Sequence, residues 1–311
     1  MNAFPTRTTT RSLSLAVAAL VATATLAGCS TDTDPVADDP APTGGTSAPP
    51  ASSSPTPEPS ESATTEPSAP AETVVAPVYF VGDTPMGPRL YREFRAVGAD
   101  NPLAEAAALM AAGDALDPDY GTLFTGGFAS VTYDEPGARF VVELADDSLT
   151  AAPSGLSKAD ARVAVQALVY TLQGVQQDRA PVVVTLDGSP TTLLGVDTSA
   201  GVKNAPQLDV LSLVNVTSPE EGATVSGSFT ANGVASSFEA TVPWEVRQGD
   251  TVVLEGFATA EGFMDQLYPW ETVVDVSGLA PGDYTFVAMT DDPSGGEGPG
   301  PFVDTKTITV G

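Results

Sequence analysis

A long tract near the N-terminus limits where this chain can fold. From Ser30 to about Ala76 the sequence is dominated by Pro, Ser, Thr, Ala and acidic residues, with no Lys or Arg and almost no large apolar side chain before Val74. Such a tract buries too little surface to offset the entropy of ordering, so we expect a disordered tether with polyproline-II character. Its roughly 45 residues span about 40 Å as a coil and about 140 Å when extended. The folded part is expected after it.

The residues before the tether have the pattern of a secretory signal. Arg7 and Arg11 precede an uncharged apolar run over residues 12–25, which is shorter than the roughly 20 residues of a membrane-spanning helix. The run ends in Leu-Ala-Gly followed by Cys29, which resembles the bacterial lipobox. That resemblance implies cleavage after residue 28 and acylation of the Cys29 thiol, for example with palmitate, so that lipid anchors the protein at the extracytoplasmic face of the membrane. The alternative is an ordinary signal peptide with an incidental cysteine.

The side-chain inventory excludes several function classes. Cys29 is the only cysteine and there is no histidine, so intrachain disulfides, histidine-based nucleophile pairs and the usual zinc sites are ruled out. We expect no cofactor and no enzymatic activity, although carboxylate-only or serine–lysine chemistry stays open in principle. The 40 acidic and 12 basic residues give a net charge of −28, which argues against nucleic acid as a partner.

Residues 77–197 are predicted to form an α+β domain, a sheet covered on one face by two helices. Apolar strand candidates alternate with two helical patterns: a first over NPLAEAAALMAAG, with Asn101 as cap and Gly113 as stop, and a second that opens at Ser157. ASVTY and ARFVVEL, joined by DEPG, read as a hairpin, and PVVVTL and TTLLGV as further strands.

After a linker over residues 198–213, residues 214–311 are predicted to form an all-β, immunoglobulin-like sandwich. FEATVPWEV, TVVLEGFATA, ETVVDV, YTFVAMT and DTKTITV alternate with period two and are separated by Gly, Pro and Asp. The first of these places Phe238, Trp244 and Val246 on one face. Tyr284 follows a Leu-Ala-Pro-Gly turn, as in the tyrosine corner of such sandwiches.

These segments carry a resemblance to known families. VYFV, RLYREFR, AEAAALMAAG, GGFASVTYDEPGARFVVEL and ARVAVQALVYTLQGVQQDRAPVVVTLDG are similar to the GerMN domain of sporulation and germination lipoproteins. VTSPEEGATVSG, SFEATVPWEV, LAPGDYTFVAMTDDPSGGEG and DTKTITV resemble the immunoglobulin-like domain that often follows it. The resemblance implies a protein that acts by protein contact, without transferable catalytic residues. The Ala/Thr/Pro/Asp-rich composition fits an actinobacterial, high-GC Gram-positive source, where such proteins occur without sporulation.

Two charged groups are candidate sites. Arg89, Arg92 and Arg95 form a basic patch in an acidic protein, to be read either as a contact for an anion or acidic partner or as arginines paired with local carboxylates. On one strand Arg92 would face away from the other two. Asp291, Asp292, Glu297 and Asp304 surround a Gly-rich segment and form a weak calcium candidate whose spacing fits no EF-hand.

Aromatic and paired acidic residues suggest a second class of function. Phe263, Tyr268 and Trp270 lie near a turn, where they either stack on sugar rings or fill the core. The pairs Asp146-Asp147 and Glu220-Glu221 invite a glycosidase interpretation, but solvated loop ends are the simpler one.

We therefore favour a membrane-anchored, non-enzymatic interaction or scaffold module of the cell envelope, whose partners are envelope proteins, cell-wall polymer or both. The alternative is a protein that binds cell-wall carbohydrate or processes glycans with carboxylates.

Overall fold

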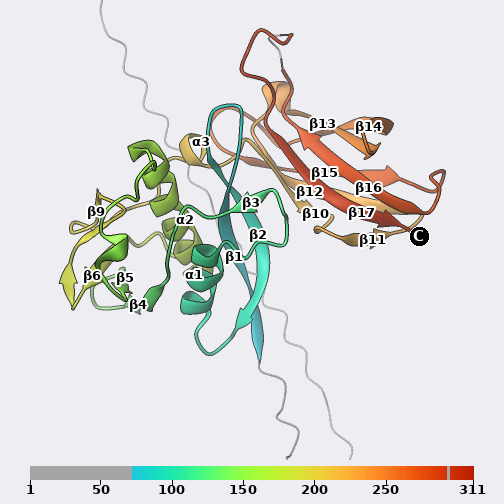
Figure 1. Ribbon diagram of the computed structural model, residues 1–311. Helices are drawn as coiled ribbons and strands as arrows, with labels where there is room; N and C mark the ends of the chain where they lie inside the picture. Colours follow the sequence, from blue (N-terminus) through green and yellow to red (C-terminus); the bar gives the residue numbers. More distant parts are fainter. Residues whose placement is uncertain (1–71, 293–294) are drawn as a thin grey trace, which may run out of the picture. The chain divides into compact units, whose positions relative to one another are not determined.

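The computed structural model describes residues 72–292 and 295–311, which belong to one compact unit (Figure 1). The signal sequence, Cys29 and the tether as far as residue 71 lie outside the described residues. Two hydrophobic cores are present, one built from residues between Ala76 and Leu211 and one from residues between Val214 and Val310. The chain thus has an α+β domain followed by an all-β domain. None of the helices in these two ranges is long and apolar enough to cross a membrane.

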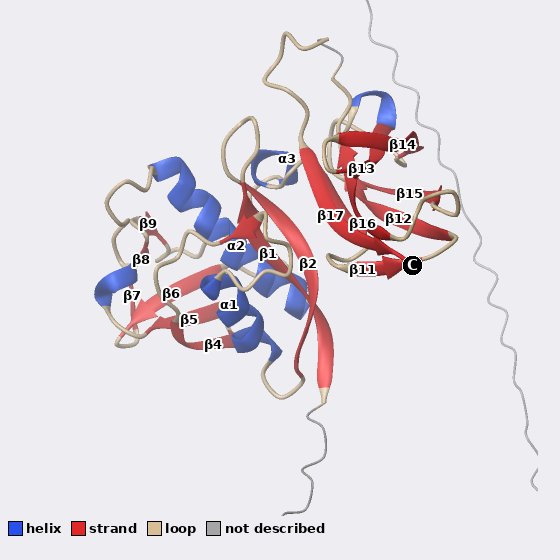
Figure 2. Cartoon of the chain, turned by 45° about the vertical axis from the view of Figure 1, so that its right-hand side comes forward, coloured by secondary structure: helices blue, strands red, loops and turns tan. Residues whose placement is uncertain are grey.

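The first domain contains α1 and α2, the two longest helices among the described residues (Figure 2). Its elements in chain order are β1 (Thr73–Gly82), β2 (Arg89–Gly98), α1 (Pro102–Ala112), β3 (Tyr120–Gly121), β4 (Phe128–Asp134), β5 (Arg139–Leu144), the 3-10 helix η1 (Asp147–Leu149), α2 (Lys158–Gln176), β6 (Val182–Leu186), β7 (Ser189–Pro190), β8 (Thr192–Leu193) and β9 (Val196–Asp197). The first strand begins at Thr73, so it takes in four residues that the sequence assigned to the tether.

Local side-chain chemistry sets the helix ends. The Asn101 side chain accepts a hydrogen bond from the Ala104 N–H, and α1 ends at Gly113, whose φ of 67° suits glycine. The Ser157 hydroxyl accepts from the Asp160 N–H at the start of α2. These caps confirm the predicted starts of both helices.

The predicted α+β class with two helices is confirmed, although the strands of the first domain form separate sheets where the prediction had a single sheet. One sheet has the order β2-β1-β3 and another has the order β4-β5-β6-β7, while β8 and β9 form a small hairpin of their own. The helices α1 and α2 pack against each other and against β1. The predicted hairpin of β4 and β5 is confirmed, and α2 makes the crossover to β6, which pairs with β5 in parallel.

The segment between the domains is ordered. Val202 pairs with Val182 in an isolated bridge, and the short helix α3 (Gln207–Val210) follows. The Ser212 N–H then donates to the Leu90 carbonyl oxygen of β2. The predicted linker is therefore bonded to the first domain.

The second domain is a sandwich of a three-stranded sheet, β10-β12-β15, and a five-stranded sheet, β11-β17-β16-β13-β14. Its elements are β10 (Val214–Ser218), β11 (Ala223–Val225), β12 (Ser228–Ala235), the 3-10 helix η2 (Phe238–Ala240), β13 (Thr241–Gln248), β14 (Thr251–Thr259), β15 (Tyr268–Asp275), β16 (Gly282–Met289) and β17 (Val303–Val310). The Tyr284 hydroxyl donates to the Ala280 carbonyl oxygen at 2.9 Å, which confirms the predicted tyrosine corner.

One predicted strand is interrupted at its start. Glu239 and Ala240 have φ values of 51° and 60°, so the chain turns through η2 before β13 begins at Thr241. Val246 is buried as expected and Trp244 is half-buried against the core. Phe238, which strict alternation would place on the same face, is instead exposed.

Candidate functional site

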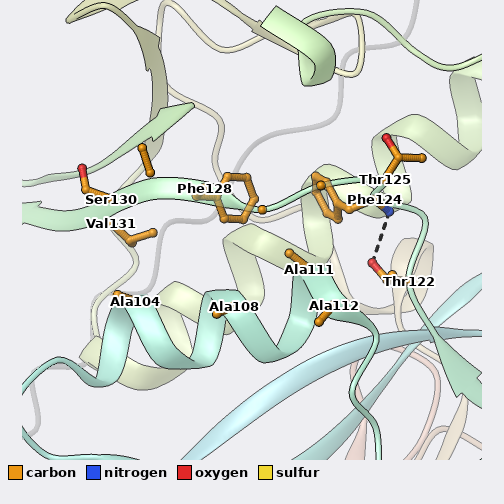
Figure 3. A pocket seen from close by; sticks show the side chains of 13 residues that line it. Ala104, Ala108, Ala111, Ala112, Thr122, Phe124, Thr125, Phe128, Ser130 and Val131 are labelled. Atoms are coloured by element: carbon orange, nitrogen blue, oxygen red, sulfur yellow. Dashed lines mark hydrogen bonds between the residues drawn. The ribbon is translucent and has the colours of Figure 1, made fainter. Parts of the chain in front are cut away.

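A groove of about 440 Å³ lies between α1 and β4 in the first domain (Figure 3). Its lining comes from α1, from the connection before β4 and from β4 itself: Ala104, Ala108, Ala111, Ala112, Thr122, Phe124, Thr125, Gly126, Gly127, Phe128, Ala129, Ser130 and Val131. Alanines spaced by four on α1 share one face of the helix. Their small side chains leave room along this face, and this room forms the groove. No ionisable side chain is in this lining, so the groove offers apolar contact and hydroxyl hydrogen bonds and lacks a general acid or base.

The floor and edge of the groove combine two aromatic rings with the outer strand of a sheet. The Phe124 and Phe128 rings meet edge to face with centroids 5.6 Å apart, and the Thr122 hydroxyl accepts from the Phe124 N–H (Figure 3). β4 is the outer strand of its sheet, and its register with β5 shifts between Phe128 and Ser130. An outer strand beside an apolar groove is a common place for protein contacts.

A buried ionic cluster joins the first domain to the second. Asp117, Asp304 and Lys306 are between 2% and 4% exposed. The Lys306 ammonium pairs with the Asp117 carboxylate and lies 3.3 Å from Asp304 Oδ1. It also donates to the Tyr120 hydroxyl at 2.8 Å, and that hydroxyl donates to Asp304 Oδ1 at 2.5 Å. Asp117 and Tyr120 belong to the first domain, whereas Asp304 and Lys306 lie on β17.

The second oxygen of Asp304 is held from within the second domain. Asp304 Oδ2 accepts from the Asn215 amide at 3.1 Å and from the Val216 N–H at 2.5 Å. Buried charges are tolerated only when they are paired and hydrogen-bonded, and every charge in this cluster meets that condition. The cluster is therefore a structural lock between the two domains.

Burial and neighbouring charges shift the pKa values of the three charged groups. Burial raises the pKa of Asp117 to about 6, although Lys306 beside it acts in the opposite direction. Burial also raises the pKa of Asp304. For Lys306, burial opposes the charged form, but the neighbouring carboxylates Asp304 and Asp117 outweigh it and raise the pKa of the ammonium.

Aromatic and hydroxyl contacts surround the lock. The Tyr91 ring stacks on the Tyr120 ring with centroids 4.7 Å apart, and the Tyr91 hydroxyl donates to the Val303 carbonyl oxygen at 3.1 Å. The Thr305 hydroxyl donates to the Asp119 carboxylate at 2.7 Å. These contacts come from both domains and add to the bonds between them.

The pH dependence of stability tests the lock. The folded-state pKa of Asp117, about 6, lies above its ordinary value of 3.8, so the folded state binds this proton more tightly than the unfolded state. This contribution to stability is present at low pH and is lost as the pH rises through about 6. Lowering the pH from about 7.5 to about 5 should therefore raise the free energy of unfolding by about 1 kcal/mol through this group. Urea unfolding at the two pH values measures it.

The Asp117→Asn variant is the control for this prediction, because it removes the titrating group and keeps a similar shape. Its stability should change less between these two pH values than that of the unmodified protein. The pKa values of Asp146, Asp197 and Asp275 are lowered by hydrogen bonds, so these groups titrate below the window. An equal pH dependence in both proteins would contradict the assignment.

The arginine candidates do not converge on one site. Arg89 donates to the backbone carbonyl oxygens of Leu208 and Asp209, and Arg95 pairs with Glu93 and Asp114. Arg92 donates to the Thr217 hydroxyl at 3.2 Å, and its guanidinium lies 4.6 Å from the centroid of the Phe94 ring. The three side chains serve contacts within the protein and form no common anion clamp.

The calcium candidate is not supported. Asp304 is buried in the ionic cluster, and Asp292 Oδ2 accepts from the Gly296 N–H. In the two described ranges, no group of three or more His, Cys, Asp and Glu side chains is arranged to hold a metal ion, and this includes Asp291 and Glu297. Asp304 was misassigned because its position near the Gly-rich segment conceals its place on the core side of β17.

The three aromatic candidates differ in how deeply their side chains are buried. Trp270 is buried in the core of the sandwich, so it is unavailable for stacking on a sugar. The Tyr268 hydroxyl donates to Asp265 at 2.8 Å, and its ring covers Gly262, where an added Cβ would lie 2.7 Å from the ring. Phe263 is half-buried and packs edge to face with Phe238. Of the two alternatives, Trp270 thus fills the core, and the three rings form no common surface for a sugar.

The acidic pairs are also placed outside the α1–β4 groove. Asp146 caps η1, in which Asp147 is the first residue. Glu220 and Glu221 line a cavity of about 60 Å³, far below the roughly 300 Å³ at which ligand pockets begin.

Three members of the buried ionic cluster were not identified from the sequence: Asp117, Tyr120 and Lys306.

With this geometry in view, two family matches define the class of the protein as one built from domains of sporulation and spore germination proteins. Residues 77–192 match the family Germane, described as sporulation and spore germination. Residues 213–297 match Gmad2, the immunoglobulin-like domain of bacterial spore germination. The chain thus carries a GerMN domain followed by a Gmad2 domain, and the resemblance noted in the sequence is confirmed. No curated protein matches the chain.

Similarities to solved structures have low sequence identities and low TM-scores. The tandem GerMN domains of the sporulation protein GerM from Bacillus subtilis match with 14% identity and a TM-score of 0.34, over 66% of this chain and 62% of that one. The fibronectin(III)-like modules of Clostridium thermocellum CbhA match with 18% identity and a TM-score of 0.22, over 31% of this chain and 93% of that one. At these scores the assignment depends on the family matches alone.

Proposed function

We propose that the protein is a membrane-anchored, extracytoplasmic lipoprotein that acts as a non-enzymatic interaction module of the cell envelope. The observation that carries this proposal is the pairing of a GerMN domain with a Gmad2 domain in one chain. The buried lock between them supports it, because a module that transmits contact needs its domains held together. In this proposal lipid on Cys29 provides the anchor and the tract before Thr73 provides the reach.

The groove between α1 and β4 supports contact as the mode of action. Its lining has apolar side chains and hydroxyl groups but no ionisable group. Envelope proteins are the proposed partners, with cell-wall polymer as the other candidate. The glycan-processing alternative finds no support in this groove, and the burial of Trp270 removes one of its three candidate rings.

Comparison of the full chain with its Cys29→Ala variant tests the anchor. In cells that produce it, the unmodified protein should carry the palmitate label and stay in the membrane fraction. The Cys29→Ala variant should carry no label and should leave the membrane fraction. Unchanged labelling and membrane retention in the variant would overturn the lipid anchor.

Crosslinking in intact cells and co-sedimentation with purified cell wall test the interaction role. A defined crosslinked partner, or saturable sedimentation with the wall, is the expected result. If no crosslinked partner is found and the protein does not sediment with the wall, the role as an interaction module is overturned.

A further inference from the structure

Three loops meet at one end of the second domain and are bonded to one another. They are residues 236–240 before β13, residues 260–267 between β14 and β15, and residues 290–292 after β16. The Ser236 hydroxyl accepts from the Met264 N–H at 3.0 Å, and the Ser237 hydroxyl accepts from the Asp291 N–H at 2.7 Å. The Ala260 N–H donates to the Ala240 carbonyl oxygen at 2.8 Å. We call this surface the acidic loop face; η2 and the loop after β16 are seen at the same end of the domain (Figure 2).

Apolar side chains are presented on the acidic loop face. Met264 is 74% exposed and Phe238 is 46% exposed, whereas hydrophobic residues of this size are usually covered. The Phe238 ring meets the half-buried Phe263 ring edge to face, with centroids 6.2 Å apart. Phe263 thus supports Phe238 from below, so that the exposed ring is held in place by packing and is ready for contact.

The same face is strongly negative. Glu239, Glu261, Asp265 and Asp291 are exposed on it. The three loops contain no Lys or Arg. Exposed apolar side chains beside exposed carboxylates favour a ligand that brings cations around an apolar anchor.

The backbone of the face has an unusual conformation at three residues. Glu239, Ala240 and Met264 have φ values of 51°, 60° and 87°, in the left-handed region that non-glycine residues rarely adopt. Glu239 and Met264 belong to two different loops, and the hydrogen bond between the Met264 N–H and the Ser236 hydroxyl joins these loops. Strain of this kind gathers at contact sites, where the surrounding structure maintains it.

From this combination we propose that the acidic loop face binds a basic peptide segment with apolar side chains, contributed by a protein partner in the envelope. The inference deepens the proposed function and rests on it, because it names the surface and the chemistry of the partner. Lysine or arginine side chains of the segment pair with Glu239, Glu261 and Asp265. Its apolar side chains pack on Phe238 and Met264, and burial of these contacts supplies most of the affinity.

The test titrates the full-length protein into a fluorescent peptide of alternating lysine and leucine. A polylysine peptide of equal charge and a peptide of alternating glutamate and leucine serve as reference probes. The apolar variant is Phe238→Ser with Met264→Ser, and the charge variant is Glu239→Gln with Glu261→Gln. The matched control is Phe257→Ser with Glu255→Gln, which removes an exposed aromatic ring and an exposed carboxylate on β14, outside the three loops. Thermal unfolding of each variant shows that it is folded.

The expected result is saturable binding of the lysine–leucine peptide with one site per chain. Both variants of the face should weaken it by about tenfold or more, and the control should leave it unchanged. Polylysine should bind more weakly because it lacks the apolar contacts. Its affinity should also fall more steeply as the salt concentration rises. Equal binding of polylysine, or equal loss in the control variant, would overturn the proposal by showing general attraction to an acidic protein. Failure here leaves the palmitate and crosslinking results unchanged, so it is distinguishable from failure of the proposed function.

Discussion

Replacement of Lys306 by methionine is expected to lower the free energy of unfolding by about 3–5 kcal/mol, because the change leaves Asp117 and Asp304 as buried carboxylates without a cation. Methionine has a similar length and apolar stem, so the loss reports the charge more than the packing. Burial already raises the pKa of both carboxyl groups, and without the ammonium they rise further. Urea unfolding at about pH 7.5 measures the loss.

Two further variants show that the effect comes from the lock. Lys158→Met removes an exposed lysine at the start of α2 and should change stability by no more than about 0.5 kcal/mol. Lys306→Met combined with Asp117→Asn and Asp304→Asn removes the uncompensated charges and should recover part of the loss. A loss below about 1 kcal/mol for Lys306→Met alone would show that the cluster does not hold the domains together.

The features that were predictable are those set by neighbours in the sequence. Asn101 and Gly113 mark the ends of α1 because capping acts over three or four residues. Tyr284 reaches a carbonyl oxygen four residues away, so its turn already indicates a tyrosine corner. Alternation within each strand likewise predicted β13 to β17, apart from the turn at Phe238.

The ionic lock was not predictable because its partners are far apart in the chain. Lys306 bonds to Asp117 across 189 positions and to Tyr120 across 186. A partial signal did exist in DTKTITV: Asp304 and Lys306 share the alternation phase of Ile308 and Val310, which is the buried phase. This phase predicts charges pointing inward, but the sequence does not name the groups that neutralise them.

The burial of individual side chains and the sheet to which each strand belongs were not predictable for a related reason. Tyr268 and Trp270 are two residues apart on β15 and share a face, yet only Trp270 is buried, because it lies farther from the end of the strand. Alternation gives the face of a residue and not its distance from the sheet edge. It also leaves strand partners open, which explains why β1 and β4 belong to separate sheets where one sheet was expected.

The core of the second domain carries the other large expected effect. Phe286 is fully buried on β16, with the Phe229 ring 5.8 Å away edge to face and the Trp244 ring at 6.2 Å. Phe286→Ala should therefore lower the free energy of unfolding by about 3–5 kcal/mol, since it removes the ring and leaves a cavity between these two aromatic side chains. Urea unfolding measures the loss, and hydrogen exchange locates it.

Phe257→Ala is the matched control, because it makes the same substitution on the same sheet at a side chain that is 68% exposed. Its stability should stay within about 0.5 kcal/mol of the unmodified protein. Equal losses for the two variants would contradict the packing assigned to Phe286. Because the Asp117–Lys306 pair joins the domains, Phe286→Ala should also speed exchange at the amides around Asp117 and Tyr120. Unchanged exchange there would mean that the first domain keeps its fold when the second opens, and that the lock does not transmit the loss.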